Sequence, residues 1–224
     1  MNTEYIKNYR DKELKQYILA YLLITISSVG FYTEESVKNT DLLPSLFSMA
    51  AIDVLVGSIC VLVFVLNELW SDKAKTKIVY RKMPSDTVFS DIASGKIDAT
   101  GFDLETAQKM YGHMADAPAN LQTAEWNKLL QKSRISEMGN VIEAERLQLM
   151  TRDICMSTIS LFIMTLAALV VLEIFSANKW DPIKMFIIPL VYLLVMFFTS
   201  RAAARSRAKR FVAIVIKNDV QSNI

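Results

Sequence analysis

The sequence has few of the residues from which catalytic and metal sites are usually built. It contains 2 cysteines and 1 histidine among 224 residues, which argues against a disulfide framework and against a structural zinc site. A glycine-rich phosphate loop, a Walker sequence, an HExxH helix and a nucleophile elbow are all missing from the chain. We therefore expect no metal, no cofactor and no enzymatic activity.

Charge is also missing from long stretches of the chain. Charged residues make up 21% of the sequence, yet four windows hold almost none. A helix needs roughly 20 apolar residues to cross the ~30 Å hydrocarbon core of a bilayer. The last window reaches this length only with the long apolar stems of Lys184 and Arg201. We predict an all-α membrane protein with four membrane-spanning helices, at residues 16–33, 43–67, 154–175 and 184–200.

Lysine and arginine are distributed unevenly among the segments outside these windows. Residues 1–15, 70–152 and 201–224 hold 22 of the 25, and the other three lie at 32–41 and 176–184. Under the positive-inside rule, the basic segments remain in the cytoplasm. The sequence therefore predicts cytoplasmic termini and a cytoplasmic 70–152 module between the second and third spans. The long leading arm, which contains acidic residues, argues against a cleaved signal peptide.

The 70–152 module has a helical pattern throughout. The second span is expected to continue as a helix to Pro84, a new helix to begin at Ser85, and another to begin around Asp103. From Ile135 onward, apolar residues recur at helical spacing with no breaker before the third span. We expect one helix of roughly 40 residues that connects the cytoplasmic module to the membrane.

Asp53 is an acidic residue near the middle of the second window, within "LFSMAAIDVLVGSICVLVFVL". A carboxylate at mid-depth costs about 2.5 to 3.5 kcal/mol on insertion scales, so it should face other helices or a water-filled cavity. Its expected partners are hydroxyls at the same depth in the other spans: Thr25, Thr165 and Tyr192. Two roles remain open. Asp53 lines an ion or proton path or sets oligomer geometry, or it is a protonated acid that only holds helices together.

Residues near the cytoplasmic entry of the third span form a second candidate site, a cytoplasmic interface. Arg152 and Asp153 could pair with each other's neighbours, or with Arg81 and Lys82 of the preceding loop, and so clamp the inner interface. Trp126 could serve as an interfacial belt residue. Ordinary boundary charges and core packing are the alternatives for these five residues.

The 201–224 tail begins with basic residues that share one helical face or lie close to it. Five of them could grip phospholipid head groups: Arg201, Arg205, Arg207, Lys209 and Arg210. Because the cluster directly follows a span, lipid contact is favoured over direct nucleic-acid binding.

This order of segments, together with "YRKMPSDTVFSDI", "EWNKLL" and "LMTRD", resembles bacterial four-helix inner-membrane effectors of anti-phage abortive-infection systems, both retron-linked and cyclic-nucleotide-linked. The resemblance implies a bacterial inner-membrane effector, restrained by cytoplasmic partner proteins and released on infection to disrupt the membrane and halt growth. A homo-oligomer is compatible with that role. The alternatives are a small ion or proton channel or transporter subunit that uses Asp53, and a membrane scaffold for cytoplasmic partners.

Overall fold

The computed structural model describes residues 3–34, 58, 61–63, 65–97, 101–136, 138–175 and 182–222. These residues form α-helices and one short 3₁₀ helix, and no strand occurs among them. The predicted all-α class is confirmed. Asp53 and most of the expected second span lie outside the described residues.

The chain divides into two compact units. The charged unit comprises Met1–Ile6, Asp72–Arg152 and Arg201–Ile224. The apolar unit comprises Lys7–Ser71 and Asp153–Ser200. Each unit has its own cluster of buried apolar side chains.

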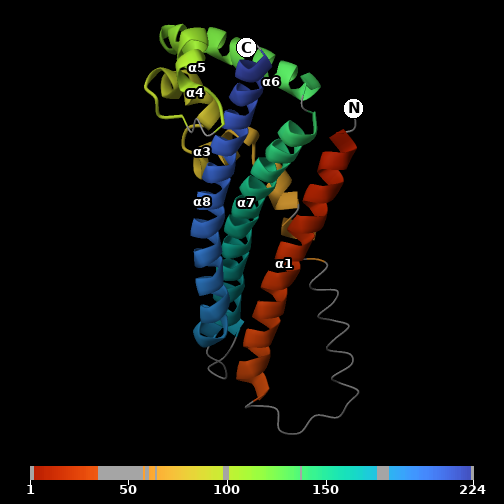
Figure 1. Ribbon diagram of the computed structural model, residues 1–224. Helices are drawn as coiled ribbons and strands as arrows, with labels where there is room; N and C mark the ends of the chain where they lie inside the picture. Colours follow the sequence, from red (N-terminus) through yellow and green to blue (C-terminus); the bar gives the residue numbers. More distant parts are fainter. Residues whose placement is uncertain are drawn as a thin grey trace. The chain divides into compact units, whose positions relative to one another are not determined.

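Two long helices take part in both units. Helix α7 (Met138–Phe175) has 38 residues and helix α8 (Pro182–Ser222) has 41. Figure 1 shows both helices as long ribbons. The expected helix of roughly 40 residues is present as α7, although it begins at Met138 rather than at Ile135. The predicted 201–224 tail is not a separate element, because α8 continues through it to Ser222.

The charged unit contains the shorter helices. These are α3 (Asp72–Val79), α4 (Pro84–Ala93), α5 (Leu104–Tyr111), the 3₁₀ helix η1 (Gly112–Asp116) and α6 (Ala119–Ser136). Their apolar faces share one core with the tail end of α8, and its largest members include Phe89, Trp126 and Phe211. Trp126, a candidate interface residue, lies in this core, where its ring is nearly perpendicular to the Phe211 ring and the two ring centroids are 6.2 Å apart. Burial of each such side chain contributes about 1.5 to 3 kcal/mol.

The boundaries of the short helices follow from local chemistry. Asp103 caps α5, because its carboxylate accepts from the amides of Glu105 and Thr106, both at 3.2 Å. Helix α4 begins at Pro84 rather than at Ser85, since the fixed φ and missing N–H of proline suit a first helical turn. The expected continuous helix from the second span to Pro84 is wrong. The chain leaves helical geometry at residues 70–71 and resumes in α3, whose first turn carries Asp72.

The apolar unit contains α1 (Thr3–Glu34), the helical residues 61–63 and 65–69, and the adjoining parts of α7 and α8. Its core is built from Ile18, Tyr21, Val63, Leu161 and Leu193, among others. The helices pack through these side chains and leave long apolar faces uncovered.

The uncovered faces of the apolar unit carry large aliphatic and aromatic side chains. The exposed members on α7 and α8 are Ile163, Leu166, Val170, Val171, Ile174, Ile183, Ile187, Ile188, Val191, Leu194, Val195 and Phe198. Among the described residues, two helices, not four, are long and apolar enough to cross a membrane. They are Gly139–Val171 and Phe186–Ser222, and only 39% and 17% of their most apolar windows are buried. These stretches cover most of two predicted spans, namely residues 154–171 of the span 154–175 and residues 186–200 of the span 184–200.

Candidate functional site

The three hydroxyl residues predicted as partners of Asp53 gather around Tyr21 of α1. The Tyr21 hydroxyl lies 2.5 Å from Thr165 Oγ1 on α7. The Thr25 hydroxyl donates to the Tyr21 carbonyl oxygen at 2.9 Å. The Tyr192 ring on α8 stacks on the Tyr21 ring, with the two centroids 6.5 Å apart. Asp53 lies outside the described residues, so its contact with this group remains a prediction.

A second hydroxyl pair lies one turn earlier along α1. The Tyr17 hydroxyl is 2.7 Å from Thr158 Oγ1, and both side chains are buried. The hydroxyls of Thr158 and Thr165 also donate to carbonyl oxygens one turn before them on α7, at 2.8 and 2.7 Å. Two tyrosines of α1 therefore each reach a threonine of α7 inside the apolar unit.

The direction of these hydrogen bonds limits what the two pairs can do. A threonine hydroxyl has a single proton to donate. Since Thr158 and Thr165 donate theirs to backbone carbonyls, Tyr17 and Tyr21 must donate to the threonine oxygens. Each chain ends on a carbonyl oxygen, which has no proton to pass on. The pairs can hold α1 against α7, but they do not form a proton relay.

Tyr17, Tyr21 and Thr158 were not among the predicted site residues. The prediction matched residues by their depth in a bilayer, which selects mid-span positions and ignores which helix faces meet. The available signal was spacing, because Tyr17, Tyr21 and Thr25 recur every four residues and so share one face of α1. A polar stripe on an otherwise apolar helix marks the face that packs against a neighbour.

Arg152, a predicted interface residue, is buried in the charged unit. Its Nη1 lies 3.2 Å from Asp72 Oδ1 on α3, and 84% of the Asp72 side chain is exposed. A pair with such a solvated partner contributes about 0 to 1 kcal/mol. The candidate partners Arg81 and Lys82 are exposed after α3, where Arg81 has a φ of 70°. Asp153 is buried and belongs to the apolar unit.

The five basic residues predicted to hold lipid head groups have different surroundings. The Nε atoms of Arg201 and Arg205 both donate to the carbonyl oxygen of Val79, at 3.3 and 3.1 Å. Val79 is the last residue of α3, so these guanidinium groups supply donors to a helix end that lacks intrahelical partners. Lys209 is exposed, while Arg207 and Arg210 line a cavity. Contact with lipid remains a prediction for all five.

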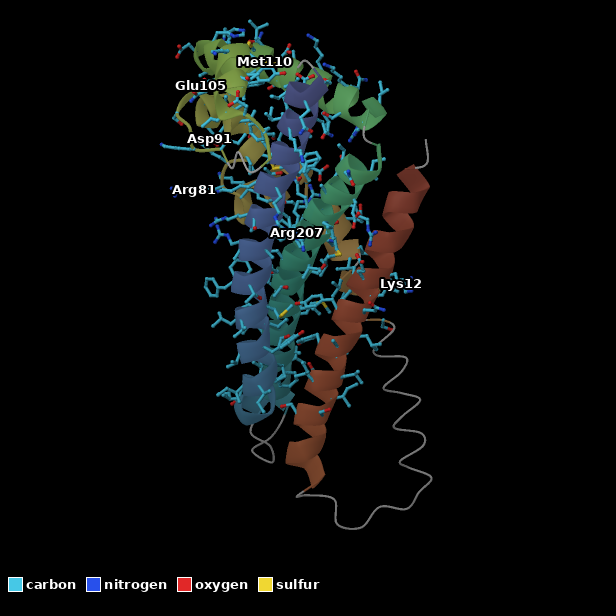
Figure 2. All side chains as sticks on the ribbon, viewed as in Figure 1. Lys12, Arg81, Asp91, Glu105, Met110 and Arg207 are labelled. Carbon is cyan, nitrogen blue, oxygen red and sulfur yellow. The ribbon has the colours of Figure 1, made fainter. Side chains whose placement is uncertain are left out.

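This cavity has a volume of about 540 Å³ and lies between α7 and α8 within the charged unit. Figure 2 labels Arg207 on the stretch of α8 that runs beside α7. The lining residues are Asn140, Glu143, Ala144, Leu147, Arg207, Arg210, Ala213, Ile214, Lys217 and Asn218.

A polar network joins three helices elsewhere in the charged unit. The Tyr111 hydroxyl of α5 donates to Asp219 of α8, and Lys132 Nζ of α6 lies 2.5 Å from the other carboxylate oxygen. Burial raises the pKa of Tyr111 above its ordinary value, and the bond to Asp219 raises this pKa further. Tyr111 is therefore a neutral donor near pH 7. The network fixes α8 against α5 and α6.

Comparisons of the chain with protein-family models, with curated proteins and with solved structures found no match. Within the parts of the chain that the structure describes, no group of three or more His, Cys, Asp or Glu side chains is placed to hold a metal ion. The function must therefore be argued from geometry and physical chemistry.

Proposed function

We propose that this chain is a four-span protein of a bacterial inner membrane, with the charged unit and both termini in the cytoplasm. The supporting observation is that the apolar unit exposes apolar side chains and buries polar ones. Val191 and Phe198 are more than half exposed, while Thr158 and Thr165 are buried. Exposed apolar faces of this extent are favourable in lipid and unfavourable in water. The basic segments favour the cytoplasmic orientation.

Within this architecture we propose a non-enzymatic effector that disrupts the membrane when its charged unit is triggered by a partner protein. The observation that carries this proposal is the continuity of α7 and α8, which take part in both units without an intervening linker. We propose that a change of packing in the charged unit is transmitted along these two continuous helices. The resemblance to anti-phage effectors supports a role in abortive infection, and homo-oligomer formation would provide a leak.

The first experiment measures membrane potential in bacteria that express the full chain from an inducible promoter, with and without its neighbouring genes. We expect depolarisation of a potential-sensitive dye on induction, and suppression of that signal by the genes that encode its partners. An intact potential under every condition, with the protein present in the membrane fraction, would remove the effector proposal.

A second experiment tests the coupling through α7. Thr151 lies just before the boundary between the units, and its hydroxyl bonds to the carbonyls of Leu147 and Gln148 at 2.9 and 3.0 Å. Thr151→Pro destabilises the helix at this point by about 3 kcal/mol or more. Thr151→Ala preserves the helix. We expect Thr151→Pro to insert normally but to lose depolarisation, while the alanine variant retains it. Equal depolarisation by both variants would contradict coupling through α7.

A channel or transporter subunit that uses Asp53 is the competing proposal. The hydroxyl pairs around Tyr17 and Tyr21 do not support it, since their hydrogen bonds end on carbonyl oxygens. Its test is flux in proteoliposomes. Loss of substrate-dependent flux in Asp53→Asn, with assembly unchanged, would favour transport over the effector role.

A further inference from the structure

The cavity between α7 and α8 in the charged unit gathers cationic side chains from one helix face. Arg207 and Arg210 are one turn apart on α8, and Lys217 follows two turns later, so the three lie along one side of the helix. All three line the cavity, and Glu143 of α7 is the only acidic residue among the described residues that line it. The cavity therefore carries an excess of positive charge.

These cations occupy a recess of the charged unit. Arg207 and Lys217 are partly buried, while Arg210 is exposed. The Lys217 stem lies over Gly101, where an added Cβ would sit 3.4 Å from Nζ. Gly101 has a φ of 98°, a conformation that side chains other than glycine rarely adopt. The loop before α5 thus leaves room for Lys217 beside the cavity.

The uncharged residues of the lining suit the uncharged part of a small organic anion. Asn140 and Asn218 provide amide groups that can donate or accept hydrogen bonds. Ala144, Leu147 and Ile214 provide an apolar surface. The volume of about 540 Å³ lies within the roughly 300 to 1,000 Å³ typical of small-molecule sites. A bare inorganic ion would fill only a small part of it.

We propose that this cavity binds a phosphate-bearing small molecule, with the phosphate against Arg207, Arg210 and Lys217. Arginine forks bind phosphate oxygens in pairs, and a lysine adds a compact positive charge. The apolar side of the cavity takes the organic part of the same molecule. A soluble phosphate ester and a phospholipid head group share this chemistry, and binding experiments can distinguish them.

The soluble source is tested by calorimetric titration of the full chain in phosphatidylcholine nanodiscs with inorganic pyrophosphate and with adenosine monophosphate. We expect Arg210→Gln and Lys217→Gln each to weaken binding about tenfold, the value of one charge-assisted hydrogen bond. Lys109→Gln is the matched control, because Lys109 is an exposed lysine of the charged unit that does not line the cavity. This control should bind as the wild type does.

The lipid source is tested by native mass spectrometry of the detergent-purified chain after incubation with phosphatidylglycerol. Retention of that lipid by the wild type and by Lys109→Gln, with loss from Arg210→Gln and Lys217→Gln, would assign the site to a head group. Absence of binding in both experiments would overturn the proposal. An equal loss in Lys109→Gln would also overturn it, because the attraction would then be that of a general basic surface.

Glu143→Gln provides a test that does not depend on weakening the site. The Glu143 carboxylate repels an anion in the cavity. Removal of its negative charge should therefore tighten anion binding several-fold. Unchanged or weaker binding by a folded Glu143→Gln protein would contradict a phosphate at this position. None of these outcomes depends on whether the protein depolarises membranes.

Discussion

The charged unit buries most of its large apolar side chains, as a protein in water does. Phe89 is 1% exposed there, and Trp126 and Phe211 pack in the same core. The apolar unit has the opposite distribution, since Phe198 is 59% exposed while Thr165 is buried. Both units are helical, and α7 and α8 contribute to each. Their surfaces, and not their backbones, set them apart.

This difference indicates that the two units are stabilised in different ways. In water, removal of apolar surface from solvent provides most of the stabilisation. In lipid, that driving force is absent between helices, and packing and interhelical hydrogen bonds take its place. The tyrosine–threonine pairs of the apolar unit are such bonds. The same kind of substitution should therefore have different consequences in the two units.

Removal of a large aromatic ring should show the largest difference. We expect Phe89→Ala to lower the free energy of unfolding of the charged unit by about 3 to 5 kcal/mol, through lost burial and the cavity left behind. Phe198→Ala, on an exposed face, should change stability in detergent by about 0.5 kcal/mol or less. Hydrogen exchange of α4 and of α8 in each variant measures both effects. A similar loss of stability in the two variants would mean that Phe198 is packed against other side chains and does not face outward.

A new charge on an exposed position should show the next largest difference. Val191 is 56% exposed in the apolar unit and Ile135 is 81% exposed in the charged unit. Val191→Arg should cost about 2.5 to 3.5 kcal/mol of insertion free energy and increase the protein released by alkaline carbonate extraction. Ile135→Arg should have no effect on extraction. Equal retention of both variants would contradict a lipid-facing surface at Val191.

Tyr111 of the charged unit should give a dependence on alkaline pH. Tyrosine in an unfolded chain ionises near pH ~10, and the pKa of Tyr111 is raised in the folded state. The unfolded state therefore loses its proton first, so stability is fully present below about pH 10 and falls as the pH rises above it. Urea unfolding at about pH 8 and about pH 10.5 should show this fall.

Tyr111→Phe is the control for this pH dependence. It removes the ionisable hydroxyl and its bond to Asp219, and should cost about 1 to 2 kcal/mol at neutral pH. The part of the alkaline slope that belongs to Tyr111 should disappear in this variant. An identical slope in the wild type and in Tyr111→Phe would show that other groups cause it.

Single hydroxyl deletions should give the smallest difference. Tyr21→Phe in the apolar unit should cost about 0.6 kcal/mol, the mean for a hydrogen bond between membrane helices. Ser133→Ala, which removes a buried bond of 3.1 Å to the Val215 carbonyl in the charged unit, should cost about 1 kcal/mol. A double-mutant cycle of Tyr21→Phe with Thr165→Val isolates the first bond. A coupling energy near zero would show that this pair does not stabilise the unit.

Local sequence features predicted several elements well. The apolar periodicity into 154–175 predicted one long helix, and α7 has this form because no proline or glycine interrupts its later turns. Asp103 marked the start of α5 because a capping carboxylate acts within three residues of itself. The break at residues 70–71 was not predicted, since neither Trp70 nor Ser71 is a helix breaker by composition. Long-range contacts of α3, such as those of Val79 with two arginines, favour its position.

The amino-acid sequence alone determined that the chain is helical, which segments are apolar and where the basic residues lie, because these properties depend on composition and on spacing within a few turns. Tertiary structure decided which faces meet. It placed Phe211 and the apolar face of the tail in the core of the charged unit, paired Tyr21 with Thr165, and separated Arg201 and Arg205 from the cavity-lining Arg207 and Arg210. Periodicity defines a face on one helix, but the partner of that face is set by packing between residues far apart in the chain.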